Sequence, residues 1–466
     1  MDNPAERPNS SHARDIASVL HPYTNLSLHQ TRGPLVLESG RGIYVTDDRG
    51  REYIEGMSGL WCASLGFGEQ ELAEAAAAQM RKLPFYHSFG HKSHNPMIDL
   101  AEKLKALAPM PASKVFFANS GSEANDTIIK MVWYYNNAVG RPLKKKIISR
   151  QRGYHSVTIF TAGLTGLPGN HRDFDLPLPG ILHTDCPYHY RNALPGESPE
   201  DFATRLADNL ERLIVREGAE TIAAFIAEPV MGAGGVIVPP PTYFEKIQAV
   251  LKRHDIFLIA DEVICGFGRT GNMWGSQTYG LQPDFLSCAK QLSAAYLPIS
   301  AVLITEPVYE VLVEQSKKIG TFGHGFTYGG HPVPAAVALK TLEIYERRDI
   351  VAEVRARTPR FQERLARLAA HPLVGETRGV GLIGAAELVA DKESKRAFQP
   401  GQGVGAFCMF AAEEHGLINR AVGDHMAFCP PLIISDSEID QLFDRFELAL
   451  ADTEAWVQRE GLRTPA

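Results

Sequence analysis

One lysine stands where a charged side chain is costly. Lys290 lies in the apolar stretch FLSCAKQLSAAYLPIS, residues 285–300, which contains no acidic residue. A buried ammonium group needs a partner that accepts its charge or a reaction that removes the charge. Condensation of the amine with an aldehyde removes it. The stretch therefore indicates a lysine that acts as a nucleophile.

A second candidate begins a helix directly after a predicted strand. In FFANSGSEAND, Ser120, Gly121 and Ser122 lead into the helix, and Ser120 with Glu123 forms an S-x-x-E capping box. Gly121 lets the backbone approach a ligand closely, and the helix N-terminus offers free N–H groups suited to a phosphate. Taken alone, the motif is more often an ordinary N-cap than a phosphate site.

Two acidic residues end predicted strands. Asp261 closes FLIAD and Glu228 closes TIAAFIAE. The adjacent residues Asp261 and Glu262 point to opposite faces of a strand, so only one of them can face a given site. A carboxylate buried there requires a cationic partner, such as a protonated pyridine nitrogen. A helix cap or a surface ion pair is the alternative for each.

Two further positions complete a possible cofactor site. Tyr154 follows the strand KKIISR and could stack on a planar ring, or simply pack. Thr327, in the loop GHGFTYGGHP, could donate its O–H and N–H to a phosphate, or belong to a connecting loop. A phosphate cradle, a buried carboxylate, an aromatic ring and a desolvated lysine together describe a pyridoxal phosphate site.

The elements that position these residues alternate along the chain. Short, continuously apolar runs with helical segments between them predict an α/β fold with a mostly parallel sheet covered on both faces. The strands are expected in KVFFANS, KKIISR, TIAAFIAEP, FLIADEV, FLSCAK and ISAVLIT. We expect a large domain over residues 71–345 and a smaller α+β domain built from residues 1–70 and 346–466. In such a sheet, ligands bind at the carboxyl ends of the strands.

Composition excludes several classes of function. The 466 residues carry a net charge of −7, which gives no basic surface for nucleic acid. No apolar run approaches the roughly 20 residues that span a bilayer, and the N-terminal MDNPAERPNSSHARD resembles neither a signal nor a transit peptide. The six scattered cysteines suit reduced thiols in a cytoplasm. Neither the cysteines nor the sixteen histidines show metal-ligand spacing, so we expect no metal.

The assembled motifs closely resemble the class III aminotransferases, of pyridoxal phosphate fold type I, and among them the ω-transaminases that use pyruvate. The resemblance spans nearly the whole chain. Its most specific motifs are TGLP, EPVMGAGGVIVPP, IADEVICGFGRTG, QPDFLSCAKQLSAAYLPISAVLI, HGFTYGGHPV and GLINRAVGDHMAFCPPLIIS. It implies a seven-stranded sheet flanked by helices in the large domain.

The resemblance also assigns roles in cofactor binding. It implies that Lys290 is the Schiff-base lysine and that Asp261 pairs with the pyridine nitrogen. The other positions implied to bind or orient the cofactor are Ser120, Gly121, Ser122, Tyr154, Val263, Glu228 and Thr327. In this family Thr327 binds the phosphate of the neighbouring subunit's cofactor, which implies a homodimer with shared active sites; dimer and tetramer are not distinguished.

The substrate positions are implied in the same way. Trp61, Phe89 and Ala233 match the substrate pocket, and Arg420 matches a mobile arginine that binds the carboxylate of a keto acid. Gly90 replaces the second aromatic residue usual after Phe89, which predicts a wider pocket for bulky amines.

The expected reaction is a ping-pong transfer of an amino group from a primary amine to pyruvate, giving alanine and a ketone or aldehyde. An aminotransferase of β-alanine or 4-aminobutyrate and a decarboxylase of the same fold remain as alternatives. The sequence also has Ser156 where the family usually has glycine, for which we expect only a small local effect.

Overall fold

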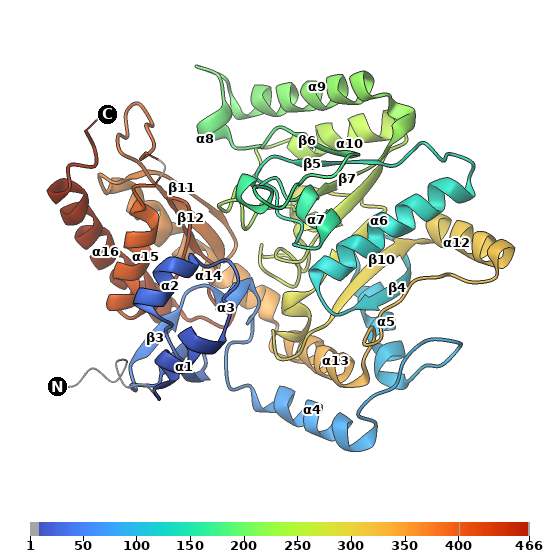
Figure 1. The fold of residues 1–466 in the computed structure, drawn as a ribbon, viewed down its shortest axis with the longest axis horizontal. Helices are drawn as coiled ribbons and strands as arrows, with labels where there is room; N and C mark the ends of the chain where they lie inside the picture. Colours follow the sequence, from blue (N-terminus) through green and yellow to red (C-terminus); the bar gives the residue numbers. More distant parts are fainter. Residues whose placement is uncertain (1–8, 400, 465–466) are drawn as a thin grey trace.

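The computed structural model describes residues 9–399 and 401–464 (Figure 1). The prediction of neither a signal nor a transit peptide rests on residues 1–15. Residues 1–8 of that stretch lie outside the described residues. Among the helices of the described ranges, none is long and apolar enough to cross a membrane.

A seven-stranded sheet forms the centre of the larger part of the molecule, in the order β4-β10-β9-β8-β7-β5-β6. Its strands are β4 (Ala112–Ala118), β5 (Lys146–Arg150), β6 (Ile181–Thr184), β7 (Ile222–Ala227), β8 (Phe257–Asp261), β9 (Phe285–Cys288) and β10 (Ser300–Thr305). Strand β10 runs antiparallel to both neighbours, and the other pairs are parallel. The mostly parallel sheet is confirmed. Strand β6 was not predicted, because its four residues ILHT include two polar ones.

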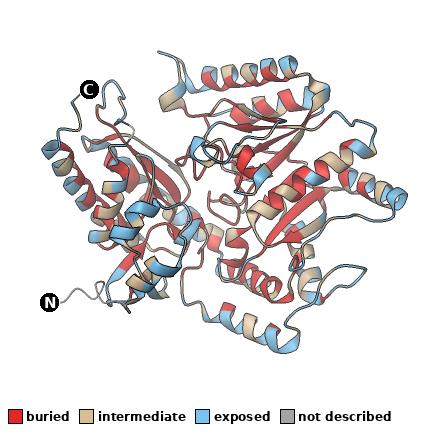
Figure 2. Cartoon of the chain, in the orientation of Figure 1, coloured by how far each residue is buried: buried red, intermediate tan, exposed pale blue. Residues whose placement is uncertain are grey.

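Helices cover both faces of this sheet and enclose two separate apolar cores. One core joins the sheet to α6 (Gly121–Ala138), α7 (Ile159–Leu164) and α12 (Glu306–Ile319). The other joins it to α5 (Asn95–Leu107), α9 (Pro199–Glu217), α10 (Tyr243–Arg253) and α13 (Pro332–Arg347). On β7, Ala224 and Ile226 belong to the first core and Phe225 and Ala227 to the second. The strand is apolar on both faces because both are covered, as Figure 2 shows.

Two four-stranded sheets lie beside the large one, with orders β1-β2-β3-β13 and β11-β12-β15-β14 (Figure 1). Their strands are β1 (Leu37–Arg41), β2 (Tyr44–Asp47), β3 (Glu52–Glu55), β11 (Val374–Val380), β12 (Ile383–Leu388), β13 (Leu417–Ile418), β14 (Arg420–Val422) and β15 (His425–Phe428). Parallel pairing of Leu417 with Ile54 joins the N-terminal and C-terminal segments in one sheet. The domain boundaries at residues 70 and 345 stay a prediction.

The remaining helices are short connectors or cover the small sheets, except α4, which packs on α13. They are α1 (Ser11–Ser18), α2 (Leu26–Arg32), α3 (Ser58–Trp61), α4 (Gln70–Lys82), α8 (His189–Asn192), α11 (Gly275–Tyr279), α14 (Ile350–Arg367), α15 (Val404–Glu414) and α16 (Asp436–Arg459). Helix α16 begins with a complete capping box between Ser435 and Glu438. Its apolar face packs on α14 and α15.

Candidate active site

A cavity of about 520 Å³ opens where the strands β8 and β9 end. Its wall gathers residues from segments that are far apart in the chain: Asn119, Ser120, Gly121, Ser122, Tyr154, Ser156, Glu228, Asp261, Val263 and Lys290, among others. This is the carboxyl edge of the parallel sheet, where polar strand ends converge. The cavity thus brings together most of the residues that the sequence singled out.

Lys290 follows β9 at the start of a 3₁₀ turn, Lys290–Ser293, with a φ of +46°. Within the part of the chain that the structure describes, its Nζ has no hydrogen bond and no ion pair. Burial lowers the pKa of the Lys290 ammonium, and the charge of Asp261 acts in the opposite direction. The amine is therefore biased toward its neutral, nucleophilic form.

Asp261 ends β8 and is almost fully buried. Its Oδ2 accepts hydrogen bonds from His155 Nδ1 and Asn125 Nδ2, both at 2.9 Å, and its Oδ1 accepts one from the Val263 N–H at 3.2 Å. Burial alone would raise the pKa of Asp261, but these donors outweigh it and lower the pKa. Asp261 stays a carboxylate and can pair with a cationic ring nitrogen.

The N-terminus of α6 leaves donors free beside the cavity. The backbone N–H groups of Gly121 and Ser122 have no partner among the described residues, as the first turn of a helix allows. Ser120 Oγ accepts from the Glu123 N–H at 3.2 Å. A Cβ on Gly121 would lie 3.1 Å from a Val263 methyl group, so glycine keeps this approach open. The arrangement suits an anion.

The predicted capping box at this helix is only half formed. Glu123 accepts from the N–H of Asn119 at 2.7 Å and from Asn119 Nδ2 at 2.8 Å, and not from the Ser120 N–H. The glutamate reaches one residue further back than the motif predicts. It thereby fixes Asn119, which also lines the cavity.

Glu228 holds the loop that carries Tyr154. Its Oε1 accepts from the Tyr154 N–H and its Oε2 from the Gly232 N–H, both at 3.0 Å. Burial raises the pKa of the Glu228 carboxyl. The pKa of Tyr154 is also raised, first by burial and then by a hydrogen bond with Tyr23, whose ring lies edge-on with a centroid separation of 6.5 Å. The sequence did not single out Tyr23.

Comparison with known proteins identifies the chemistry of this cavity. Residues 27–450 match the family model of the class III aminotransferases. The chain is a class III aminotransferase. A thermostable omega transaminase mutant from Pseudomonas jessenii has the same fold, with a TM-score of 0.95 and 59% identity over 96% of this chain and 99% of that one. The fold-type I class is confirmed.

Curated relatives carry different substrate names. Gamma aminobutyrate transaminase 3 of Solanum lycopersicum is 53% identical over 94% of this chain and 85% of its own length. Vanillin aminotransferase of Capsicum frutescens is 51% identical over 91% of this chain and 93% of its own. The comparisons therefore agree on aminotransfer and differ on the substrate.

Class III aminotransferases use pyridoxal phosphate, and another P. jessenii omega transaminase structure, 58% identical, is a complex with PMP. The residues of the cavity fit this cofactor. Lys290 offers an unpartnered amine, Asp261 a buried carboxylate, and the start of α6 two free N–H donors.

Arg420 begins β14 and lies half-buried on the small-domain side of the aminotransferase. No carboxylate pairs with its guanidinium in the described ranges of the chain. Burial lowers the pKa of Arg420, and its other electrostatic partners are Tyr154 and Tyr23. A half-buried cation without a protein anion, close enough to Tyr154 to interact with it electrostatically, suits a substrate carboxylate.

Trp61 and Ala233 do not line the cavity wall itself. Trp61 is 1% exposed, with a φ of +65°, and belongs to a buried apolar cluster that also contains Ile264, which does line the cavity. Ala233 is buried in the loop that Glu228 anchors. Both therefore lie behind or beside the site within one chain.

Phe89, Gly90 and Thr327 lie elsewhere, on what we call the loop face, residues 85–90 and 321–331. Phe89 and Gly90 line a separate hollow of about 770 Å³ with Phe116, Phe326 and other residues. Phe89 is 50% exposed, and Thr327 is exposed as well. The single chain does not bring these three residues to Lys290.

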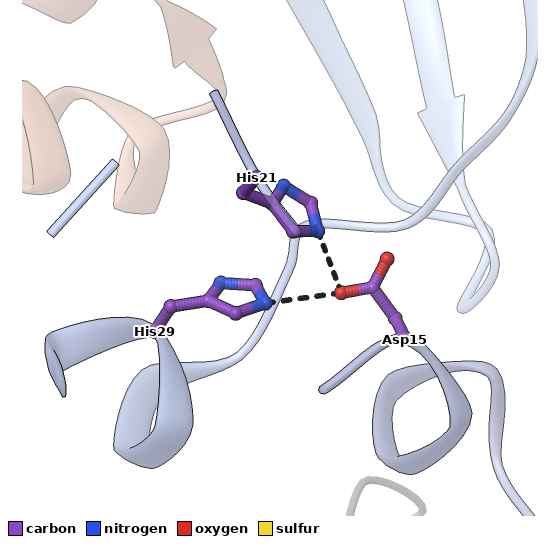
Figure 3. Close-up of side chains that lie close together, drawn as sticks. All are labelled: Asp15, His21 and His29. Atoms are coloured by element: carbon purple, nitrogen blue, oxygen red, sulfur yellow. Dashed lines mark hydrogen bonds and ion pairs between the residues drawn. The ribbon is translucent and has the colours of Figure 1, made fainter. Parts of the chain in front are cut away.

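Sequence reasoning also missed a cluster near the N-terminus (Figure 3). His21 Nε2 and His29 Nε2 both reach Asp15 Oδ1, at 2.8 and 3.0 Å. The three side chains have metal-ligand chemistry, but the spacing 15, 21, 29 matches no regular ligand motif. The bonds tie α1 to α2 on either side of Tyr23, the residue that contacts Tyr154.

Proposed function

We propose that this aminotransferase is an ω-transaminase that moves the amino group of a primary amine to pyruvate, giving alanine and a ketone or aldehyde. The observation that carries the proposal is Arg420, a half-buried guanidinium without a protein carboxylate, next to Tyr154. An arginine fork binds a carboxylate bidentately, so the site offers a place for the acid of the acceptor. An amine without a carboxylate would need Arg420 to move aside.

In this proposal each residue of the cavity has a separate role in the reaction. When bound, pyridoxal phosphate withdraws electrons from the substrate carbon. Lys290 Nζ, biased toward its neutral form, would accept the proton from that carbon and hold it for transfer. Asp261, which hydrogen bonds from His155 and Asn125 hold in place, would stabilise a protonated ring nitrogen. Tyr154 would cover the ring, and the free N–H groups at the start of α6 would hold the phosphate.

A second candidate, an aminotransferase of 4-aminobutyrate or β-alanine, is favoured by the names of the tomato relatives. Arg420 could bind the carboxylate of such a donor as well as that of the acceptor. The two cases differ in geometry, because the carboxylate of pyruvate is attached to the reacting carbon and that of 4-aminobutyrate lies further along the chain.

Half-reactions of Arg420→Met separate the two candidates, with Arg420→Lys as the matched variant that keeps a charge. For the ω-transaminase we expect the half-reaction with 1-phenylethylamine to persist, while the pyruvate half-reaction slows by about 10²-fold, since a bidentate charged hydrogen bond is lost. A pyruvate half-reaction unaffected by the substitution would overturn the proposal. Efficient use of 4-aminobutyrate, lost in Arg420→Met, would favour the second candidate, and release of carbon dioxide would indicate a decarboxylase.

We also propose a homodimer with shared active sites. The exposed aromatic residues of the loop face and its 770 Å³ hollow support a protein contact there. In that arrangement Phe89, Gly90 and Thr327 would serve the active site of the second copy. The family resemblance, in which Thr327 reaches the neighbouring cofactor, points the same way.

The pocket for bulky amines depends on this dimer. Gly90 has a φ of +59°, and a Cβ there would meet only Lys92 Nζ, at 3.3 Å. The space is open, but the backbone conformation disfavours larger residues. Structures related to this chain include an omega transaminase variant engineered for asymmetric synthesis of enantiopure bulky amines. Comparing relative rates for a small arylalkyl amine and a bicyclic amine in Gly90→Ala tests the idea; unchanged ratios would contradict it.

A further inference from the structure

Ser156 occupies a backbone conformation that serine rarely adopts. Its φ is +106°, in the region that favours glycine, and the resembling family usually has glycine at this position. Tyr154 and His155, which contact the cofactor site, directly precede it. A strained non-glycine residue at a functional site calls for a compensating interaction.

The position of Ser156 suggests what that interaction is. The loop that carries it runs against the first turns of α6, where the Asn125 Nδ2 donates to the His155 carbonyl at 3.1 Å. A Cβ built on Gly121 would lie 3.8 Å from Ser156 Oγ. Ser156 also lines the same cavity as Lys290. Its hydroxyl therefore lies beside the helix start that offers free N–H groups.

The hydroxyl of Ser156 has no partner of its own. The Ser156 carbonyl accepts from Thr165 Oγ1 at 3.0 Å, but Ser156 Oγ makes no hydrogen bond to any residue that the structure describes. The residue is buried from bulk solvent, so its hydroxyl meets the cavity. The hydroxyl is therefore a donor that faces the cavity and is available to a ligand bound there.

We propose that Ser156 Oγ donates a hydrogen bond to the phosphate of the cofactor, in addition to the donors of Ser120, Gly121 and Ser122. A phosphate carries more acceptor sites than the two free N–H groups at the start of α6 can fill. The hydroxyl adds a donor from a second element, and the interaction offsets the strain at Ser156. This role is specific to chains with serine here.

The test measures binding and not turnover, using the full-length protein freed of cofactor. Ser156→Gly removes the hydroxyl and relieves the backbone. We expect its Kd for pyridoxal phosphate and for inorganic phosphate to rise about tenfold, its Kd for pyridoxal, which lacks the phosphate, to stay unchanged, and the Tm of the cofactor-free protein to hold or rise.

Asp173→Gly is the matched control. Asp173 is exposed, with a φ of +61°, and makes no hydrogen bond to the described residues, so the substitution relieves similar strain away from the cavity. It should leave all three affinities unchanged. The proposal is overturned if Ser156→Gly binds pyridoxal phosphate as tightly as the parent, or if its affinity for pyridoxal falls by the same factor, because the effect would then lie on the ring or the loop.

Discussion

The two hollows of this aminotransferase differ in how complete they are. Around Lys290, the two buried carboxylates of the cavity wall are bonded within one chain: Asp261 accepts from three donors, and Glu228 from two backbone N–H groups. On the loop face, aromatic side chains stand open to solvent, with Phe89 at 50% and Tyr328 at 60% exposure.

We therefore assign the catalytic chemistry to the cavity around Lys290 and the selection of the amine in part to the loop face. Lys290, Asp261 and the start of α6, which are proposed to move the proton and to hold the ring and the phosphate, come from one sheet edge of a single chain. Phe89, Gly90 and Thr327, by contrast, lie on the loop face, away from the Lys290 of their own chain. Four predictions test this separation, from the largest expected effect to the smallest.

Removing the nucleophile should abolish catalysis without touching the loop face. We expect Lys290→Ala to lower turnover roughly 10⁴-fold, because no other described amine lines the cavity to move the proton. It should also lose the visible absorbance band of the lysine-bound cofactor. Lys105→Ala, an exposed lysine on α5, serves as control. Substantial turnover in Lys290→Ala would refute the assignment.

Removing the charge of Asp261, the expected partner of the ring nitrogen, should lower turnover less than removing Lys290. Asp261→Asn keeps the shape but removes the charge, and we expect turnover to fall on the order of 10²-fold through lost electrostatic stabilisation. The neighbouring Glu262 accepts from the Gly275 and Ser276 N–H groups instead and points away from the cavity. Glu262→Gln should therefore leave the rate nearly unchanged, and equal losses in steady-state kinetics would contradict the roles.

Mixed dimers test whether the loop face completes the other chain's site. Thr327→Ala should weaken cofactor binding about tenfold. Lys290→Ala chains mixed with Thr327→Ala chains should yield dimers with one parental site. The control places both substitutions in one chain and mixes it with parental protein, which leaves no mixed dimer with an intact site. With the mixed dimers purified from the homodimers, the first should keep one site of parental cofactor affinity in equilibrium dialysis and the control none; the reverse result would exclude sharing.

Mild acid should loosen the loop face first. Burial, aided by the charge of Lys130, lowers the pKa of His324 to about 4. Its ring stacks on Phe116, and its nitrogens bond Thr127 Oγ1 and Lys130 Nζ, each at 2.8 Å. The unfolded form binds a proton below about pH 6.5 and the folded form only near pH 4. Stability is therefore complete above pH 6.5 and is lost as pH falls toward 4.

We expect a loss on the order of 1 kcal/mol, allowing for partial exposure of the ring. Relative to the intrinsic chemical exchange rate, which itself slows at lower pH, hydrogen exchange should quicken in residues 321–331 between pH 7 and pH 5, while residues 119–126 stay protected. His324→Gln, which cannot titrate, should remove the difference. Equal quickening in both segments would show that the two regions are not separate.

Much of this picture could be predicted from the sequence. Six of the seven central strands, and the polar residue that ends or follows each strand of the site, follow from apolar runs and turn residues. The contacts of Asp261 could not, because His155 and Asn125 lie 106 and 136 positions away. The pattern of ILHT was too short and too polar to mark β6, and the cluster of Asp15, His21 and His29 has no regular spacing.

The sequence by itself determined which groups are available: a lysine without an acidic neighbour, a serine-glycine-serine turn before a helix, and a carboxylate at a strand end. Only the tertiary structure decided which atoms keep a partner. It gives both oxygens of Asp261 a donor, leaves Lys290 and the first N–H groups of α6 free, and places Thr327 on another face. The reason is geometric, because parallel strands bring distant carboxyl ends to one edge, while the loop after β10 and α12 leaves that edge.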